Sequence, residues 1–151
     1  MYQPKSSAEV SALYQEMILD HYRRPRNKGV LENADARVEM KNPLCGDEIA
    51  LQVQFDADEI RDLKFSGRGC SISQASASMM TQLLKGKSRE EINAIRNQFR
   101  DLMLGIASEK DETGLGPLRA LSGVARFPAR VKCALLAWNA LEAALLEQPS
   151  V

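Results

Sequence analysis

Apolar side chains recur at helical spacing along the N-terminal part of the chain. They follow Ser6-Ser7-Ala8-Glu9, a segment with the spacing of a helix-capping box. The residues that share one helical face are Val10, Leu13, Tyr14, Met17, Ile18 and His21. Pro25 ends the pattern, and Asn27-Lys28-Gly29 provides the exit. We therefore expect an N-terminal helix with one apolar face.

The C-terminal part of the chain has a more strongly apolar helical pattern. Pro128 suits the first turn of a helix, where the amide that proline lacks would have no partner. Between Cys133 and Leu146 only Asn139 and Glu142 are polar. Such a helix has no continuous polar face to turn toward water, so we expect a long helix that is largely buried.

Between these helices the pattern changes to alternation and predicts strands. The apolar residues that alternate with polar or small ones are Ile49, Leu51, Val53 and Phe55. The segment 56–59, Asp-Ala-Asp-Glu, has the composition of a hairpin turn into a second strand over Ile60–Ser66. Ala36–Met40 is a candidate third strand. We expect a small antiparallel three-stranded sheet.

Helical spacing returns after Cys70, where one apolar stripe ends at Gly86. Its members are Ile72, Ala75, Met79 and Leu83. Ser88-Arg89-Glu90-Glu91 is a second capping box, and the helix it opens has an apolar side made of Ile92, Ile95, Phe99, Leu102 and Met103. Gly105–Pro117 is charged and rich in glycine, which indicates a mobile surface loop. These elements predict an α+β fold in one domain over residues 1–151, with helices packed against the sheet.

The composition excludes several classes of function. Twenty basic residues balance twenty acidic ones, so no net charge attracts nucleic acid or an anionic membrane. Aromatic residues make up only 5% of the chain, too few for stacking on single-stranded nucleic acid. No apolar run approaches the roughly 20 residues of a membrane-spanning helix, and the N-terminus lacks a signal-peptide pattern. We expect a cytoplasmic protein, in which three cysteines do not form a disulfide framework.

Cys45 and Asp47 are the first candidates for chemistry. They flank Gly46 just before the best predicted strand. In an extended chain, residues two apart point to the same side, so the two side chains can meet at one point. Gly46 lets the backbone bend there without a side-chain clash. A thiolate and a carboxylate together suit zinc or iron.

The other two cysteines lie at predicted helix starts. Cys70 follows Gly67-Arg68-Gly69 at the junction of a strand and a helix, where free amides and the positive charge of Arg68 favour a thiolate. Cys133 lies in the first turns of the last helix, close to Arg130 and Lys132. Three thiolates and one carboxylate match the four ligands that zinc prefers.

Each of these residues also has a simpler interpretation. A lone cysteine in a cytosolic protein often serves as a small buried hydrophobe, and Cys133 on its apolar helix is the first example. Asp47 also suits a turn before a strand. The spacing contains neither CxxC nor HExxH, so the residues alone leave open both a shared metal site and simple packing.

Two other patterns carry little weight. The segment Gly67–Ser73 resembles the start of a dinucleotide-binding fingerprint but lacks its third glycine. His21, the only histidine, falls on the apolar face of the first predicted helix, where we expect a structural role. A Ser-His-Asp triad therefore lacks its usual base.

Four ordered segments resemble the SufU/IscU family of iron–sulfur cluster assembly proteins, whose members resemble the N-terminal domain of NifU. The resemblance covers nearly the whole chain and keeps the three cysteines in register. The segments are Leu19-Asp20-His21-Tyr22 with Pro25-Arg26-Asn27 and Gly29, Asn42-Pro43-Leu44-Cys45-Gly46-Asp47, Gly67-Arg68-Gly69-Cys70-Ser71-Ile72-Ser73-Gln74-Ala75-Ser76, and Arg130-Val131-Lys132-Cys133. By this resemblance, the metal ligands are Cys45, Asp47, Cys70 and Cys133.

Three departures from the scaffold branch of that family point to its SufU-like branch. Scaffold members carry a histidine immediately before the last cysteine, where this chain has Lys132, and a protonated lysine has no lone pair for a metal. Their Leu-Pro-Pro-Val-Lys chaperone signal is replaced by the segment Phe127–Lys132. The interval between Cys70 and Cys133 is also longer than in the scaffolds.

The SufU-like branch implies a zinc-dependent sulfurtransferase. The resemblance makes Cys45 the sulfur acceptor and a SufS-like, pyridoxal-phosphate-dependent cysteine desulfurase its partner, with cluster-assembly machinery downstream. Arg130 either stabilises the thiolate or persulfide anion or is a solvated charge at a helix end. Two alternatives remain open: a scaffold that assembles a 2Fe–2S cluster on the same four residues, and a zinc-stapled adaptor without sulfur chemistry.

Overall fold

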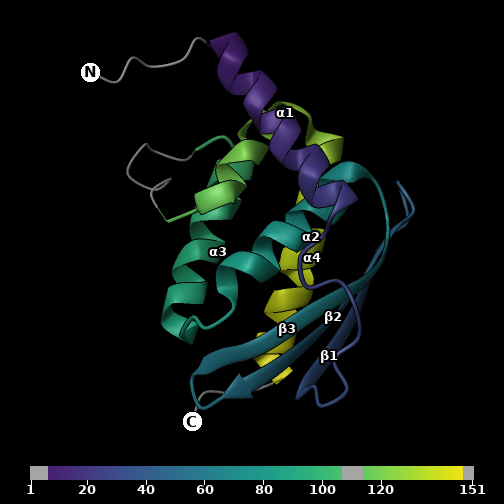
Figure 1. The fold of residues 1–151 in the computed structure, drawn as a ribbon, viewed down its shortest axis with the longest axis vertical. Helices are drawn as coiled ribbons and strands as arrows, with labels where there is room; N and C mark the ends of the chain where they lie inside the picture. The colour runs from purple at the N-terminus through teal and green to yellow at the C-terminus, as the bar shows by residue number, and fades with distance from the viewer. Residues whose placement is uncertain (1–6, 107–113, 148–151) are drawn as a thin grey trace.

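Three strands and five helices make up the part of the chain that the structure, a computed structural model, describes: residues 7–106 and 114–147. The α+β class predicted from the sequence is confirmed (Figure 1). In chain order the elements are α1 (Ser7–Arg23), β1 (Ala36–Asn42), β2 (Asp47–Asp56), β3 (Glu59–Arg68), α2 (Ser71–Leu84), α3 (Arg89–Met103), the 3-10 helix η2 (Gly116–Arg126) and α4 (Pro128–Glu147). No helix in these ranges is both long and apolar enough to cross a membrane.

The sheet has the order β1-β2-β3, and both neighbouring pairs are antiparallel, as predicted. Asp56 pairs with Glu59, so the predicted hairpin turn is reduced to Ala57 and Asp58. Asn42 lies opposite Asp47 at the other end of β2, which leaves residues 43–46 to connect β1 and β2. This short connection contains the first candidate cysteine.

Helices α2 and α4 cover one face of the sheet. Helix α4 contacts β1 and β2, and α2 contacts β3 and lies beside α4. In Figure 1, α4 (yellow) runs behind the strands, while α1 and α3 lie farther from the sheet. The helix α4 is largely buried, as predicted from its composition. The core therefore lies between one face of a small sheet and these two helices, and it continues into the buried sides of α3 and η2.

Helix α2 is more deeply buried than its single predicted stripe indicates. Ser73, Ser76, Ser78 and Thr81 are all buried. Ser76 Oγ donates to the carbonyl oxygen of Ala134 (2.6 Å) and accepts from the indole Nε1 of Trp138 (3.1 Å). Because small hydroxyl side chains find partners on neighbouring elements, α2 can lie inside the molecule although it is rich in serine.

The predicted burial is wrong for two residues, one in α1 and one in β2. Leu13 was expected on the apolar face of α1 but is 45% exposed. Gln52 was expected on the open face of the sheet but is buried, because its Oε1 accepts a hydrogen bond from the backbone amide of Leu31 (2.5 Å). The segment between α1 and β1 thus covers part of the second face. The capping box expected at Ser6 lies outside the described residues.

The loop expected over Gly105–Pro117 is only partly a loop. Residues 107–113 lie outside the described ranges, but Leu115 is fully buried and η2 begins at Gly116. The buried apolar side chains of this segment are Leu115, Leu118, Leu121 and Val124. Their spacing of three matches the three residues per turn of a 3-10 helix, so they line one face. The signal is present in the sequence, but its period differs from the 2 of a strand and the 3.6 of an α-helix.

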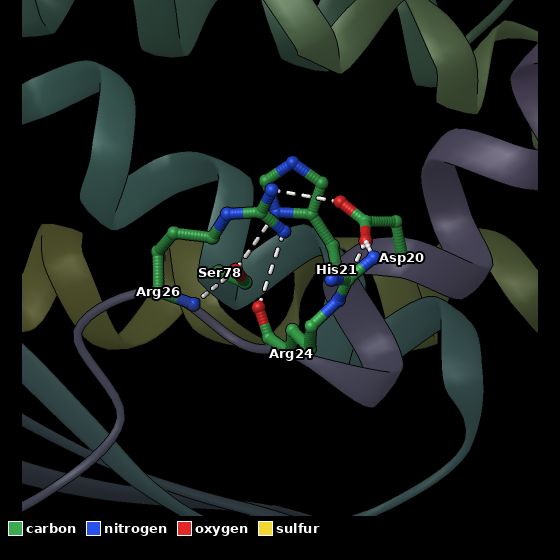
Figure 2. A network of polar contacts seen from close by, with 5 residues as sticks. All are labelled: Asp20, His21, Arg24, Arg26 and Ser78. Atoms are coloured by element: carbon green, nitrogen blue, oxygen red, sulfur yellow. Dashed lines mark hydrogen bonds and ion pairs between the residues drawn. The ribbon is translucent and has the colours of Figure 1, made fainter.

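A polar network fixes the exit of α1 to α2, as Figure 2 shows. The Nδ1 atom of buried His21 lies 2.8 Å from Ser78 Oγ, which also accepts the backbone N–H of Arg26 at 2.8 Å. The Arg26 guanidinium in turn pairs with Asp20 at 2.7 Å. His21 therefore has a buried partner within the protein, in agreement with its expected structural role.

The second predicted capping box is confirmed at the start of α3. Ser88 Oγ accepts the backbone N–H of Glu91, and a carboxylate oxygen of Glu91 accepts the N–H of Ser88, both at 3.2 Å. The apolar side of α3 is buried as predicted, and Phe99 stacks on Trp138 of α4 with ring centroids 4.8 Å apart.

Candidate metal and sulfur site

The turn between β1 and β2 presents Cys45 to solvent. Asn42 organises the turn, because its side-chain Oδ1 accepts from Leu44 N–H (3.2 Å) and its carbonyl oxygen from Gly46 N–H (2.9 Å). Gly46 has a φ of 72°, a left-handed conformation that glycine adopts without a side-chain clash. Leu44 and Cys45 are both exposed. The extended backbone expected at Cys45 is therefore wrong, whereas the bend expected at Gly46 is confirmed.

The folded chain brings the candidate ligands together. Cys45 Sγ lies 2.9 Å from Asp47 Oδ2 and 3.3 Å from Cys133 Sγ. These three ligand atoms all lie within 4.8 Å of one another. Cys70 Sγ, at the N-cap position of α2, lies 3.9 Å from Asp47 Oδ2 and is not part of that closest trio. All three cysteines are free thiols.

The three thiols differ in exposure. Cys45 is exposed, Cys70 is half-buried, and Cys133 is buried in the second turn of α4. A reactant that arrives from solvent therefore meets the sulfur of Cys45 first. The other two sulfurs line the inner side of the same cluster.

Asp47 is fully buried and remains acidic. Burial raises the pKa of its carboxyl group, but hydrogen bonds from the Cys45 thiol and the Cys70 amide, with smaller contributions from Cys133 and Ser73, outweigh burial and leave the pKa below its ordinary value. The carboxylate thus stays negatively charged inside the protein. It provides one fixed anionic oxygen at the centre of the thiol cluster.

The pKa of the Cys133 thiol is shifted in the opposite direction, upward. Burial raises the pKa of its thiol far above the ordinary value, and hydrogen bonding to Asp47 and Cys45 and the nearby charge of Cys70 act in the same direction. In the part of the chain that the structure describes, no basic side chain forms a hydrogen bond or ion pair with Cys133 Sγ, which contacts Cys45 Sγ and the carbonyl oxygen of Ala129. A divalent cation would supply a compensating positive charge and stabilise the deprotonated form.

The donor set and its spacing fit zinc. Tetrahedral zinc with Zn–S bonds of about 2.3 Å and Zn–O bonds of about 2.0 Å requires S···S separations of about 3.8 Å and S···O separations of about 3.5 Å. The separations found are 3.3 Å from Cys45 Sγ to Cys133 Sγ, and 2.9 and 3.9 Å from Asp47 Oδ2 to the sulfurs of Cys45 and Cys70. Each differs from the required value by about half an ångström or a little more. Small side-chain movements therefore suffice for Cys45, Asp47 and Cys133, whereas Cys70 Sγ, which lies outside that 4.8 Å trio, has to move closer to complete a tetrahedral site.

Arg130 and Lys132 lie on the rim and outside the cluster. Both are exposed in the first turns of α4. Within the described ranges, no hydrogen bond or ion pair joins the Arg130 guanidinium to Asp47 or a cysteine. Arg130 instead lines a cavity of about 870 Å³ between α1, η2 and the starts of α2 and α4, together with Ser71 and Ile72. Sequence reasoning did not predict this cavity.

Two further residues that contact Asp47 were not singled out from the sequence. Ser73 helps to lower the pKa of Asp47 while its Oγ donates to the carbonyl oxygen of Cys70 (3.1 Å), and Gly69 lies directly against the Asp47 carboxylate. Ser73 follows Cys70 by three residues, a spacing that places both on one side of a helix start, and this was the available signal.

Proteins with a similar sequence are named as a zinc-dependent sulfurtransferase or as iron–sulfur cluster assembly scaffold proteins. Residues 13–149 match the family described as the NifU-like N-terminal domain. The chain is 52% identical over 136 residues to the zinc-dependent sulfurtransferase SufU of Bacillus subtilis. The aligned region covers 90% of this chain and 91% of that protein. It is 44% identical to the iron–sulfur cluster assembly scaffold protein IscU of Streptococcus pyogenes, with coverage of 91% and 86%.

Solved structures agree with this relationship. A cluster assembly scaffold protein for the SUF system from Fervidobacterium islandicum superposes with a TM-score of 0.82 and 40% identity, over 93% of this chain and 99% of that one. Both the fold and the sequence are thus shared along nearly the full length. The chain belongs to the NifU-like N-terminal domain family and is a member of its SufU/IscU group.

Proposed function

We propose that this protein is a zinc-dependent sulfurtransferase of iron–sulfur cluster assembly that accepts sulfur from a pyridoxal-phosphate-dependent cysteine desulfurase. The observation that carries the proposal is one exposed thiol, Cys45, in contact with a buried carboxylate and a buried thiol. The zinc ligands in this proposal are Cys45, Asp47, Cys70 and Cys133. Zinc, when bound, would supply the positive charge that holds these thiols deprotonated and protected from oxidation.

The sulfur-transfer step assigned to Cys45 requires no added oxidant or reductant. The Cys45 thiolate attacks the terminal sulfur of a persulfide on the donor protein. A new S–S bond forms at Cys45, the S–S bond of the donor breaks, and the donor cysteine leaves as a thiolate. The exposure of Cys45 supports its role as acceptor, since the buried Cys133 offers no access to another protein. The reaction belongs in a reducing compartment such as the cytoplasm.

Lys132 favours transfer over cluster scaffolding. It occupies the position next to Cys133, is exposed, and as an ammonium group has no lone pair for iron. The relative named as a zinc-dependent sulfurtransferase is also more similar to this chain than the one from Streptococcus pyogenes named as a scaffold. Arg130 is close in sequence to the acceptor cluster, and we assign it the supporting role of attracting the anionic persulfide.

The test is sulfur transfer from a cysteine desulfurase to the full chain, with metal content measured on the same sample. We expect a colourless protein with about one zinc per chain, and a gain of one sulfur atom on the peptide that contains Cys45. Cys45→Ala should abolish both this gain and the stimulation of the desulfurase, whereas Ser71→Ala should leave both intact. A brown protein with iron and sulfide would favour a scaffold, and undiminished stimulation by Cys45→Ala would favour an adaptor.

A further inference from the structure

The backbone at Gly69 leaves a space that the carboxylate of Asp47 fills. A Cβ atom at this position would lie 2.5 Å from Asp47 Oδ1 and 2.9 Å from the Asp47 carboxyl carbon, and would also press on Ser73 Oγ. Real Cβ atoms essentially never approach another atom this closely. Gly69 is not among the glycines with a left-handed φ, so contact with Asp47, and not backbone conformation, explains why glycine is needed here.

The two carboxylate oxygens of Asp47 have different partners. Oδ1 accepts the backbone N–H of Cys70 at 2.9 Å, next to Gly69. Oδ2 faces the sulfurs, 2.9 Å from Cys45 Sγ and 3.9 Å from Cys70 Sγ. Because Asp47 is fully buried, water does not compete for either oxygen. Turning the carboxylate away would leave the Cys70 amide without its acceptor, and the loss of that hydrogen bond opposes the movement.

We propose that Gly69 and the Cys70 amide hold Asp47 so that it offers a metal ion one oxygen only. A carboxylate that is free to turn can bind a cation through both oxygens, as it does in calcium sites with six to eight ligands. With Oδ1 occupied, Asp47 adds a single ligand to the three thiolates, and the total is the four that zinc prefers. Gly69 is therefore a positioning residue that limits the coordination number. This inference rests on the metal-binding part of the proposed function and is independent of sulfur transfer.

A double-mutant cycle on the full chain tests the inference. The affinity for Zn²⁺ is measured by competition with a chelator in the parent protein, Gly69→Ala, Asp47→Ala and the double variant. Gly69→Ala should weaken zinc binding about 10–100-fold, as typical for residues that orient a ligand. In the Asp47→Ala background the same change should shift the affinity by no more than about twofold, because no carboxylate is left to displace.

Gly123→Ala provides the matched control. A Cβ there would lie 3.7 Å from a guanidinium nitrogen of Arg126, which is ordinary contact, so zinc affinity should not change. If Gly69→Ala reduced zinc affinity equally in the parent protein and in Asp47→Ala, the positioning role would be overturned, while the metal site itself would stand. No effect of Asp47→Ala on affinity would overturn both the inference and Asp47 as a ligand.

Two spectroscopic measurements extend the test beyond affinity. Co²⁺ bound to the parent protein should give the intense visible absorption of a tetrahedral site, and Gly69→Ala should weaken or shift it. In the zinc-loaded parent protein the Cys70 amide should exchange slowly with solvent deuterium, and in Asp47→Ala it should exchange quickly. The exchange measurement needs no Gly69 variant, so it tests the hold of the Cys70 amide on Asp47 even if Gly69→Ala does not fold. Equal exchange rates would overturn the inference.

Discussion

The sulfur atoms of Cys45 and Cys133 lie 3.3 Å apart, although 88 residues separate the two cysteines in the chain. One sulfur belongs to the exposed turn between β1 and β2, and the other to the buried side of α4. The contact joins the part of the site that meets solvent to the part embedded in the core. Because the two sulfurs are so close, whether they can form a disulfide should depend on whether a metal ion binds them.

We expect the metal-free protein to form a Cys45–Cys133 disulfide when treated with oxidised glutathione. The two thiols lose two electrons and two protons, and the glutathione disulfide is reduced to two thiols. Zinc-loaded protein should resist the reaction, because the sulfurs are then engaged as ligands. Peptide mapping by mass spectrometry without reductant identifies the linked pair. A disulfide that links Cys45 to Cys70 instead would contradict the arrangement described here.

Asp47→Ala should lower both zinc retention and thermal stability. The change removes one proposed ligand and leaves the half-buried Cys70 amide without an acceptor, which costs about 0.5–1.5 kcal/mol even without metal. Calorimetry with and without zinc separates the two effects. Asp47→Asn is the matched control, since its carbonyl oxygen can still accept from Cys70. It should keep most of the metal-free stability yet gain less from zinc than the parent protein does. Unchanged zinc retention and melting temperature in Asp47→Ala would exclude Asp47 as a ligand.

Acid should destabilise the protein through His21. Burial lowers the pKa of this imidazole, and the nearby positive charge of Arg26 lowers it further. In the unfolded chain His21 binds a proton near pH 6.5, whereas the folded chain binds it only at lower pH. The free energy of unfolding should therefore fall as the pH drops below about 6.5 toward the folded-state pKa.

Urea unfolding of metal-free protein at several pH values measures the slope of the free energy of unfolding against pH. His21 is the only histidine in the chain, so His21→Asn should remove most of the slope in this range. Asparagine is a suitable replacement because its side-chain amide can donate to or accept from Ser78 Oγ, the atom that Nδ1 contacts. An identical slope in the variant would mean that other groups control the response to acid.

Ser76→Ala should destabilise the contact between α2 and α4. The change leaves the indole N–H of buried Trp138 and the carbonyl oxygen of Ala134 without their partner, at an expected loss of about 1–3 kcal/mol. Chemical unfolding followed by the fluorescence of Trp138, the only tryptophan, measures the loss. Ser66→Ala on β3 is the control and should change stability by less than about 0.5 kcal/mol. A loss no larger than that of the control would show that this hydrogen-bonded pair is not important for stability.

Strong local periodicity allowed much of the fold to be predicted from the sequence. Alternation in β2, the capping box at Ser88 and the almost unbroken apolar composition of α4 each reflect interactions within a few residues along the chain. The period of three in η2 is equally local, but it differs from the periods of strands and α-helices. By contrast, the burial of Gln52 depends on a segment about twenty residues away that covers the sheet, and no local pattern reports that.

The sequence by itself determined which side chains are available for chemistry: three cysteines and an aspartate within motifs that mark the family. Only the tertiary structure decided that Cys45 is exposed while Cys133 is buried, and that Gly69 makes room for Asp47. The reason is that ligand distances depend on how a hairpin turn and the first turns of two helices pack around the sheet. That packing is the sum of many weak contacts between distant segments, so spacing along the chain does not encode it.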